Sequence, residues 1–494
     1  MMQRSAIVRA ALAGTMLTVP LPALAQSAPA SSQREAELEA RLNTLEQAVQ
    51  QLRAELAAAR STPTASSATA APPSGGPVAQ PQVVQAQAPG TSGQSGPEQP
   101  TGGRAIVAEA KAPPPPTAAP AQDGFKVAGT TVRINGFFKT WAAVSHYDGG
   151  NIAADSVGRD FYFPSFIPVG GVSTGNNFEA HAKQTRIAIS TATPVAGKEL
   201  KALFEADFQV VPGTQGNQRV VNGYDLGLRR AFLTYDKFLV GQEWSTFQYV
   251  AALPETTDFL GPSDGTVFIR QAQLRYTEKL SPELSLSVAV ENPDTSYATT
   301  TSAANVSSAT DRLPDFAARL NWLMPNGMEL SLAGLARKLT VDTGTVDDSA
   351  AGWGVSFAGK LPLTEDKRWD VRFMLNHGDG IGRYVGLNLI PDAVLGTDGR
   401  LYTPTVTAGF GAVRLGWTEQ LRSTIMAAFQ KGKYQDGVAA AGASESSWSA
   451  AANLFYSPVK NLDFGFEYRH GERELITGAS GTLDRGEFAA KYSF

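Results

Sequence analysis

From Gly124 onward, hydrophobic and polar residues alternate with a period of two in one segment after another. In one such segment Phe464, Phe466 and Tyr468 alternate with charged residues. This period is that of a β-strand with one apolar and one polar face. The pattern predicts sixteen strands, near residues 131–142, 181–193, 199–211, 224–236, 238–248, 266–278, 283–291, 313–324, 327–341, 351–362, 367–377, 404–418, 421–433, 446–457, 461–473 and 483–494.

The polar faces of these strands carry charges. In the segment 367–377, the apolar Val371 and Phe373 alternate with Asp370 and Arg372. Charged faces do not suit a dry core, whereas they suit the wet interior of a membrane barrel. No stretch approaches eighteen uninterrupted apolar residues, so no transmembrane helix is predicted. We therefore predict an all-β fold, a transmembrane antiparallel β-barrel of about sixteen strands over residues 125–494, because a closed barrel leaves no unpaired edge in lipid.

The lengths of the connections support the same architecture. Short turns are predicted at 194–198, 278–282, 324–326, 363–366 and 457–460. They alternate with long, polar, glycine-rich loops at 143–180, 212–223, 249–265, 292–312, 342–350, 378–403, 434–445 and 474–482. Alternation of this kind is typical of outer-membrane barrels, whose short turns face the periplasm and whose long loops face outside. Aromatic residues near strand ends are expected to form the interfacial girdles, namely Trp322, Trp369, Trp417, Tyr456 and Tyr492.

The N-terminal part has a different composition. Arg4 and Arg9 precede an apolar stretch at 10–19, and residues 22–25 read PALA, so residues 1–25 are predicted to be a secretory signal peptide. The alternative is a retained anchor helix. The chain has no cysteine, which is compatible with export, and its formal charge of −4 gives no indication of nucleic-acid binding.

Residues 33–60 are predicted to form a helical coiled coil. Leucine and valine recur at alternating steps of four and three residues, at Leu38, Leu42, Leu45, Val49, Leu52 and Leu56. This is a heptad seam, and three heptads are adequate for self-association beside another oligomer contact. A single amphipathic helix lying on a neighbour is the alternative. Residues 61–124 are rich in Pro, Ala, Ser, Gly, Thr and Gln, and we predict a disordered linker there.

The end of the chain is an amphipathic strand that closes on Phe494. An aromatic residue in this place resembles the assembly signal of bacterial outer-membrane barrels. Three further stretches resemble the DcaP-like trimeric porins, a family of outer-membrane channels with an N-terminal coiled coil. They are residues 240–247 (VGQEWSTF, followed by Gly261 and Pro262), 268–276 (FIRQAQLRY) and 378–384 (GDGIGRY).

The resemblance covers residues 124–494 in strand order, and Ala272 stands where a proline is expected from the family. It implies a homotrimer in the bacterial outer membrane, in contact with lipid and lipopolysaccharide, whose N-terminal extension lies in the periplasm. It also implies passive diffusion of small anionic organic solutes, dicarboxylates among them. Peptidoglycan is a candidate partner of the extension. A non-selective diffusion porin, and a structural tether with a plugged lumen, remain the alternatives.

A channel for anions needs cationic side chains at its constriction. Strand alternation places one set of cations on the polar faces, namely Arg133, Lys139, Arg186, Arg275, Arg319, Arg372 and Arg414. Arginine suits carboxylate ligands because its planar fork binds both oxygens. The alternative is that such arginines pair with acidic residues of the wall, for which the candidates are Glu205, Asp207, Glu243 and Glu291.

Three arginines do not fit simple alternation. Arg229 and Arg230 are adjacent, so both can face inward only if the strand contains a bulge. Arg270 has the parity of the apolar face. A charge on the lipid face costs roughly 2–4 kcal/mol near the bilayer midplane. We therefore expect these three in the lumen, at a membrane interface or between protomers.

The loop 249–265 follows the fifth predicted strand, where porin-type barrels commonly fold a loop into the lumen. It carries Glu255, Asp258 and Asp264, which are the candidate constriction residues. An ordinary surface loop is the alternative.

Nothing in the sequence favours an enzyme. The four histidines, His146, His181, His377 and His470, are scattered, and no metal-ligand spacing, phosphate loop or nucleophile elbow is present. We therefore expect no catalytic activity and no cofactor.

Overall fold

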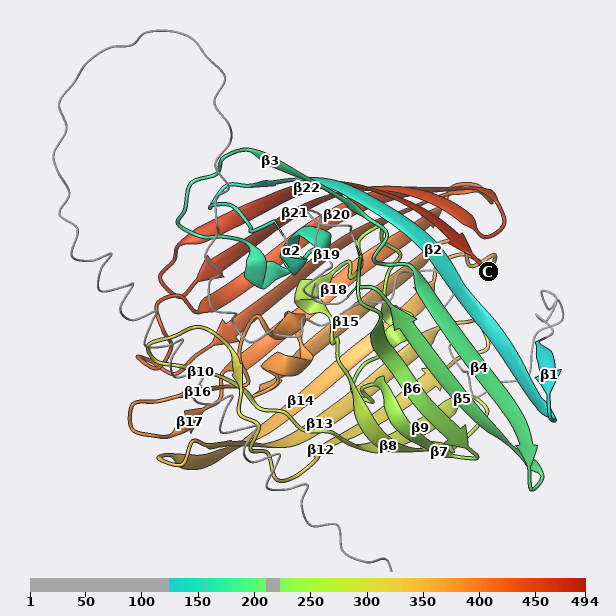
Figure 1. The fold of residues 1–494 in the computed structure, drawn as a ribbon, viewed down its shortest axis with the longest axis horizontal. Helices are drawn as coiled ribbons and strands as arrows, with labels where there is room; N and C mark the ends of the chain where they lie inside the picture. Colours follow the sequence, from blue (N-terminus) through green and yellow to red (C-terminus); the bar gives the residue numbers. More distant parts are fainter. Residues whose placement is uncertain (1–123, 155, 210–222) are drawn as a thin grey trace, which may run out of the picture. The chain divides into compact units, whose positions relative to one another are not determined.

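The computed structural model describes residues 124–154, 156–209 and 223–494. They form a closed antiparallel barrel of sixteen strands (Figure 1), as predicted. The barrel strands are β2 (Thr130–Tyr147), β4 (Arg186–Val195), β5 (Lys198–Asp207), β6 (Gly227–Tyr235), β7 (Phe238–Trp244), β8 (Arg270–Lys279), β9 (Leu284–Glu291), β12 (Asp315–Leu323), β13 (Glu329–Asp342), β14 (Asp347–Pro362), β15 (Asp370–Asp379), β18 (Thr405–Gly416), β19 (Leu421–Lys433), β20 (Ser444–Val459), β21 (Leu462–Leu475) and β22 (Ser480–Ser493).

Each barrel strand pairs with the next along the chain, and β2 closes the ring. The first half of β2 pairs with β4, the second half pairs with β22, and Phe137 is opposite both Arg186 of β4 and Ser493 of β22. Closure leaves no exposed edge in the ring, which is the condition for a sheet to stand in lipid.

Smaller elements lie outside the ring of sixteen. Two short strands pair with β2, namely β1 (Phe125–Val127) and β3 (Asn176–His181). A second sheet consists of β10 (Ser296–Thr299), β11 (Val306–Ser307), β16 (Ala393–Leu395) and β17 (Leu401–Tyr402). The helical turns are α2 (Val157–Asp160), η1 (Pro164–Phe166), η2 (Val250–Ala252), η3 (Ser263–Gly265), η4 (Gly382–Tyr384) and η5 (Gly386–Asn388).

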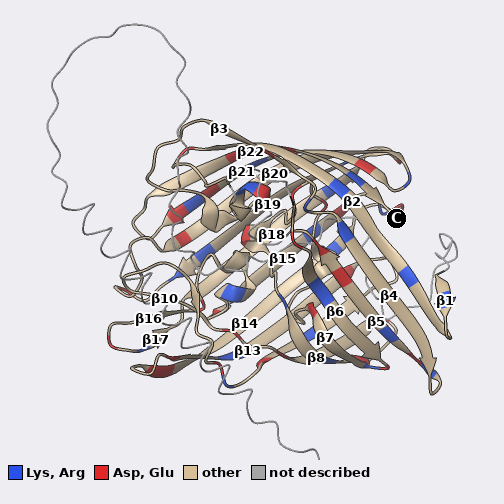
Figure 2. Cartoon of the chain, viewed as in Figure 1, with Lys and Arg blue, Asp and Glu red and all other residues tan. Residues whose placement is uncertain are grey.

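The two faces of the wall follow the alternation of the sequence. In β22, Arg485, Glu487 and Lys491 are buried inside the barrel, whereas Tyr492 is exposed on the outside. Charged positions occur in the middle of the strands as well as at their ends (Figure 2). The outer face is apolar, and Trp322, Trp417, Tyr456 and Tyr492 are among its exposed aromatic residues. Trp369 is half-buried and packs edge-on against Trp417.

The short turns and the chain's end lie at one end of the barrel. β1 and the C-terminus are together there, and β10, β16 and β17 lie at the opposite end (Figure 1). Two connections predicted to be long are in fact short. Only the four residues 343–346 join β13 to β14, and only residues 476–479 join β21 to β22. In both cases the strands themselves continue beyond their predicted ends, so the length appears as strand rather than loop.

Several predicted strand boundaries were also wrong. The strand predicted at 131–142 continues to Tyr147, and the one predicted at 199–211 ends at Asp207. The predicted strand at 181–193 begins only at Arg186, because residues 176–181 form the separate strand β3. The predicted strand at 238–248 ends at Trp244, and the one at 266–278 begins at Arg270. Residues 245–248 and 266–269 were thus predicted as strand but lie in the connection between β7 and β8. This connection is a loop that folds inside the barrel.

The predicted signal peptide (1–25), coiled coil (33–60) and nearly all of the linker (61–124) lie outside the described residues. In the part of the chain that the structure describes, no helix is long and apolar enough to cross a membrane.

Candidate channel lumen and constriction loop

The connection between β7 and β8, residues 245–269, folds into the barrel. All of its residues except Val250, Ala251 and Ile269 are buried. Its first and last residues are joined by a hydrogen bond from Ser245 N to Ile269 O (3.0 Å). We call this segment the constriction loop. The prediction that residues 249–265 turn inward agrees with this placement, and the surface-loop alternative does not.

The constriction loop is held by side chains from the far side of the barrel. Lys139 of β2 donates from Nζ to Thr257 O (2.8 Å), and Thr257 Oγ1 donates to Glu487 of β22 (2.9 Å). Thr256 Oγ1 donates to Glu467 of β21 (2.6 Å). These bonds fix the middle of the loop against β2, β21 and β22, strands that lie far from β7 and β8 in the ring.

The three acidic residues predicted on this loop all have partners. Glu255 accepts a bidentate pair of hydrogen bonds from Arg422 of β19 (2.7 and 2.6 Å), and Arg414 Nε lies 3.8 Å from it. Asp258 accepts from three backbone N–H groups, those of Tyr162 (2.8 Å), Leu260 (2.6 Å) and Gly261 (3.0 Å). Their carboxylates therefore brace the loop.

Asp264 joins the loop to β20 and to a second loop. It accepts hydrogen bonds from Ser447 Oγ (2.6 Å), Ser449 Oγ (2.5 Å) and the Tyr162 hydroxyl (2.9 Å). Burial raises the pKa of the Asp264 carboxyl above its ordinary value, and the three hydroxyl donors oppose that rise. This carboxylate anchors the turn η3 to the wall.

A second connection, between β2 and β3, also folds inward, which the sequence analysis did not predict. Its helix α2 begins after Ser156, whose side chain accepts from Gly158 N (3.3 Å). Phe161 and Phe163 of this connection pack with Phe259 and Phe268 of the constriction loop. The sequence feature that could have predicted this inward fold is the group of aromatic residues within an otherwise polar loop, because aromatic side chains are stabilised by burial.

A row of arginines follows the constriction loop, one from each of several wall strands. Arg275 of β8 donates to Trp244 O (2.6 Å), and Arg319 of β12 donates to Gln248 O. Arg372 of β15 donates to Leu253 O (2.6 Å). Arg319 and Arg372 thus each contact a carbonyl of the constriction loop, while Arg275 contacts Thr246 Oγ1 of the loop and the carbonyl of Trp244 just before it.

Another set of predicted arginines is fully engaged with acids. Arg186 and Arg229 both contact Asp207 (2.9 and 2.8 Å), and Arg229 also contacts Glu205 (2.9 Å). Arg230 makes two hydrogen bonds to Glu243, both 2.7 Å. The alternative of structural pairing with Glu205, Asp207 and Glu243 therefore describes these three arginines.

The adjacent arginines both face inward because β6 contains a bulge. Glu205 of β5 is opposite Arg230, while the next residue, Ala206, is opposite Leu228. Arg229 is the extra residue, and both guanidinium groups are buried among carboxylates.

The last predicted cations differ in their surroundings. Lys139 is buried, whereas Arg133 is exposed near the start of β2 on the same face. Arg372 is paired with Asp370 (2.6 Å). Arg270 lies two residues before the outward-facing Ala272 and so has the same strand parity. Its guanidinium lies 5.0 Å from the ring centroid of Trp244. Arg270 therefore lies beside an aromatic side chain at the end of β8.

Within the described residues, neither Arg275 nor Arg319 has a carboxylate within 4.0 Å of its guanidinium group. Five other predicted arginines each have one, namely Arg186, Arg229, Arg230, Arg372 and Arg414. Arg275 bonds to Thr246 Oγ1 (2.9 Å), Gln273 Oε1 (3.1 Å) and Trp244 O. Arg319 bonds to Gln248 O, and its guanidinium carbon lies 5.8 Å from the ring centroid of Tyr249. Both side chains are partly exposed.

Several inward arginines were not among the predicted site residues. Arg422, Arg469 and Arg485 have the parity of polar neighbours in β19, β21 and β22, and this parity was a sufficient signal. Arg337 of β13 is buried between Asp315 (2.9 Å) and Asp392 (2.8 Å).

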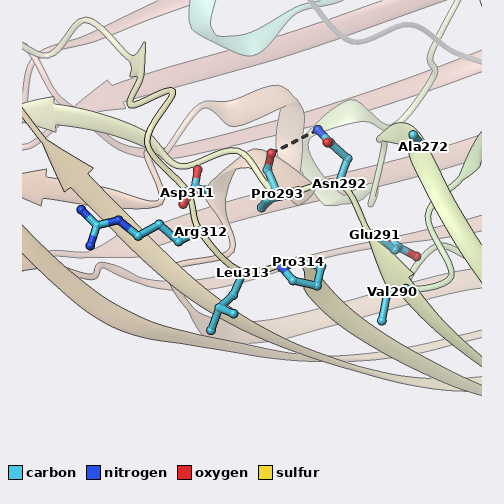
Figure 3. Close-up of a pocket in the computed structure, with 9 residues that line it drawn as sticks. All are labelled: Ala272, Val290, Glu291, Asn292, Pro293, Asp311, Arg312, Leu313 and Pro314. Carbon is cyan, nitrogen blue, oxygen red and sulfur yellow. Dashed lines mark hydrogen bonds between the residues drawn. The ribbon is translucent and has the colours of Figure 1, made fainter.

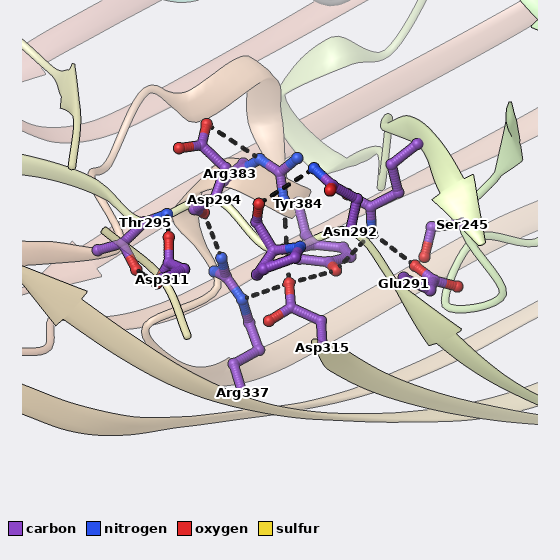
Figure 4. Close-up of polar contacts among 12 residues, drawn as sticks. Ser245, Glu291, Asn292, Asp294, Thr295, Asp311, Asp315, Arg337, Arg383 and Tyr384 are labelled. Carbon is purple, nitrogen blue, oxygen red and sulfur yellow. Dashed lines mark hydrogen bonds and ion pairs between the residues drawn. The ribbon is translucent and has the colours of Figure 1, made fainter. Parts of the chain in front are cut away.

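Figure 4 shows the network around Arg337. The Tyr384 hydroxyl donates to Asp315 (2.8 Å) and accepts from Gln271 Nε2 (2.7 Å). Tyr384 belongs to the quoted stretch 378–384, and Arg383 of the same stretch lies 3.6 Å from Asp294. The network ties the loop after β15 to β8, β12 and β13.

An open pocket of about 370 Å³ lies at the rim, where β9 ends and β12 begins (Figure 3). Its lining includes Glu291, Asn292 and Arg312, and Arg312 is paired with Asp342 (3.2 Å). Among the described residues, no group of three or more His, Cys, Asp or Glu side chains is placed to hold a metal ion.

A family model described as the DcaP outer membrane protein matches residues 163–494. The chain belongs to this family. The fold and the family together identify an outer-membrane channel of the porin type, and the predicted family resemblance is confirmed. None of the curated proteins matches the chain.

Among solved structures, the outer membrane channel DcaP of Acinetobacter baumannii is similar, with 27% identity and a TM-score of 0.61. The match covers 75% of this chain and 100% of that one. The anion-selective porin of Comamonas acidovorans is 9% identical (TM-score 0.47), covering 74% of this chain and 100% of that one. A loop-deletion variant of OmpT of Vibrio cholerae is 11% identical (TM-score 0.44), with the same coverage. The last two likenesses are too weak to carry an argument.

Proposed function

We propose that this channel passes small anionic organic solutes, dicarboxylates among them, by passive diffusion. The observation that carries the proposal is the state of Arg275 and Arg319, which are partly exposed beside the constriction loop and have no carboxylate partner among the described residues. A cation without an ion pair attracts anions to the narrow part of a lumen.

The spacing of the two arginines suits a short dicarboxylate. β9 lies between their strands, and it is opposite Arg275 at Ala289 and opposite Arg319 at Ser287. Neighbouring strands are about 4.8 Å apart, so the two backbones are about 10 Å apart. The small side chains between them leave room for both guanidinium groups to reach one ligand. Each fork would hold one carboxylate.

The acidic residues nearest this pair are occupied elsewhere. Glu243 is bound by Arg230, and Glu291 accepts from Thr246 N (2.6 Å) and Gln271 Nε2 (2.7 Å). Glu255, on the constriction loop, is bound by Arg422. Because these carboxylates are already satisfied, an entering anion does not have to displace one of them from Arg275 or Arg319.

The test is the reversal potential of the purified protein in planar bilayers under a KCl gradient, followed by addition of succinate. We expect anion preference and a succinate-dependent decrease in current. Arg275→Gln and Arg319→Gln should each weaken the succinate effect about tenfold, since a hydrogen bond to a charged group contributes about 1.5 kcal/mol. Arg133→Gln removes the same charge away from the constriction loop and should have a smaller effect.

Two results would contradict the proposal in different ways. Large currents without ion preference, unchanged by both substitutions, would indicate a general diffusion porin. Folded protein that gives no current would favour the structural tether with a plugged lumen, for which the two inward loops are the relevant observation.

We further propose that the channel is a homotrimer. β7 has 7 residues and β9 has 8, whereas β20 has 16. A strand needs about 9–11 residues to cross a bilayer at a tilt of about 45°. The wall at β7 and β9 is therefore low, although β5 and β8 have 10 residues each, and Leu233, Val240 and Val288 are exposed on this part of it. Contact with two further copies would cover this face, while the remaining outer face would meet lipid and lipopolysaccharide.

The N-terminal extension completes the proposal. With the chain ends of the barrel at the short-turn end, residues 26–124 would lie in the periplasm. A coiled coil at 33–60 would support the trimer, and peptidoglycan is the proposed partner of the extension.

A further inference from the structure

Another arginine faces the lumen near the end of the barrel that carries the long loops. Arg473 has the inward parity of Arg469 and lies two residues before the end of β21. The next strand, β22, runs from there to the C-terminus at the opposite end. Within the described residues, the guanidinium group of Arg473 makes no ion pair with a carboxylate. It therefore resembles Arg275 and Arg319 in its surroundings.

The acidic neighbours of Arg473 in β21 point to the outer face of the barrel. Glu472 accepts a hydrogen bond there from Trp448 Nε1 (2.9 Å). Glu474 accepts one from Ser446 Oγ (3.2 Å). Because successive side chains of a strand lie on opposite faces, neither carboxylate reaches the charge of Arg473.

The nearest acid of the constriction loop is also engaged. Ser447 of β20 is opposite Arg473, and its hydroxyl donates to Asp264 (2.6 Å). Asp264 also accepts from Ser449 Oγ and from the Tyr162 hydroxyl. These hydroxyl groups satisfy the carboxylate and keep it bound to β20 and to the connection between β2 and β3.

Neutral groups hold Arg473 in place and leave one of its nitrogens open. Nε donates to Ser444 Oγ (2.9 Å). Nη1 donates to Ser165 O (2.7 Å) and Ile167 O (3.2 Å), both in the connection between β2 and β3. Within the described residues Nη2 has no hydrogen-bond partner, and it is not buried. Two N–H groups of a fixed cation are thus open to the lumen.

We propose that Arg473 is an outer docking site, where a carboxylate of an entering solute binds before it reaches Arg275 and Arg319. This inference rests on the proposed function and adds a second site for the same solutes. A cation without an ion pair at the mouth of a channel raises the local concentration of anions and their rate of association.

The geometry of Arg473 suits a site that solutes leave again. Conduction requires binding that is favourable enough for entry and weak enough for release. The open N–H groups of Arg473 belong to a single nitrogen, whereas a bidentate fork binds a carboxylate through two. The contact is therefore weaker than a bidentate pair.

The two sites lie toward opposite ends of the lumen. Arg473 contacts the connection between β2 and β3, near the long loops. Arg275 and Arg319 each lie four residues before the short-turn ends of β8 and β12. A solute that enters from the side of the long loops therefore meets Arg473 first.

The test measures succinate binding from each side of a planar bilayer, with the full-length protein. Because the chain has no cysteine, the background substitution Thr345→Cys gives one labelling site. Thr345 is exposed in the turn between β13 and β14, so its label identifies the side of the long loops. Succinate is added to one side at a time, and interruptions of the single-channel current give its association rate and residence time.

Arg473→Gln should lower the association rate from the long-loop side about threefold, which is part of the gain of about tenfold or more that a charged cleft provides. The rate from the short-turn side should stay unchanged. The difference should shrink in about 1 M KCl, where the Debye length is about 3 Å. Arg473→Lys keeps the charge without the two carbonyl contacts and should retain most of the rate. Arg312→Gln is the matched control, because Arg312 lies at the rim but is paired with Asp342 (3.2 Å).

Equal association rates of the wild type and Arg473→Gln from the long-loop side would overturn the proposal. An equal fall from both sides would overturn it too, since Arg473 would then only brace the connection between β2 and β3. If Arg473→Gln does not fold, the wild-type rates decide, because a docking site requires a steeper salt dependence from the long-loop side. Each of these failures leaves the proposed function intact. A wild-type channel that succinate blocks from neither side would contradict the proposed function, and the docking site with it.

Discussion

Gly265, in the turn η3 near the end of the constriction loop, shows how one residue sets the position of that loop. A Cβ atom at this position would lie 2.1 Å from the carbonyl of Gly409 in β18, so the loop and the wall touch through their backbones. Next to it, Asn376 Nδ2 donates to Gly265 O (2.9 Å). Glycine is needed here because any side chain would push the loop toward the centre of the lumen.

For this single residue we predict that Gly265→Ala displaces the turn η3 of the constriction loop away from β18. The substitution overpacks a backbone contact and should destabilise the protein by about 1–3 kcal/mol. The single-channel conductance should change together with the thermal midpoint. Gly411→Ala is the matched control, because a Cβ atom on that residue of β18 meets nothing within 4 Å. Equal behaviour of the two variants would show that the close approach does not position the loop.

Among the elements, the unequal lengths of the strands bear most directly on what covers the outer face of the barrel. Seven tilted residues span roughly 16 Å of membrane thickness, which is less than the apolar band of about 25 Å. β7 is of this length, whereas β14 and β20 have 16 residues each. β9 is nearly as short, with 8 residues, while β5 and β8 have 10 each. A low, apolar stretch of wall is stable in a membrane only if something other than lipid covers part of it.

A charge on this low wall should therefore separate the protomers. We expect Val240→Arg, on the outer face of β7, to lower the fraction of trimer seen on unheated gels and by light scattering. Ile425→Arg, on the outer face of β19, carries the same cost of roughly 2–4 kcal/mol in lipid and should leave the trimer fraction unchanged. Both side chains are exposed in the single chain. Loss of trimer in neither variant would contradict the proposed interface.

On the scale of the whole molecule, we propose separate roles for the barrel and the N-terminal extension. The barrel is complete in hydrogen bonding without residues 1–123, because β2 pairs on both sides. In the proposed division, the extension serves assembly or attachment.

Deletion of residues 26–124 tests that division. The variant should still form a heat-modifiable barrel in the outer membrane, while its trimer yield and its co-sedimentation with peptidoglycan should fall. Replacing residues 61–110 by a flexible Gly/Ser segment of equal length is the control, since it keeps the coiled-coil segment and the reach of the linker. An unchanged trimer yield and unchanged fractionation after the deletion would remove both proposed roles.

The sequence by itself determined the barrel and the faces of its strands. A period of two in sixteen segments fixes which side chains point inward, because successive side chains of a strand lie on opposite faces. Arg275, Arg319 and Arg372 were placed in this way, and the inward position of the constriction loop was expected from its place after the fifth strand. The bulge at Arg229 was also foreseeable, since two adjacent charges cannot otherwise share a face.

Only the tertiary structure decided which of these charges have partners. Parity places Arg186 and Arg275 on the same inner face, yet Arg186 meets Asp207 while Arg275 meets backbone and neutral groups. The partners come from strands and loops that are distant along the chain, and their choice depends on how two loops fold across the lumen. That folding rests on long-range packing, such as Phe161 against Phe259, which no local pattern encodes.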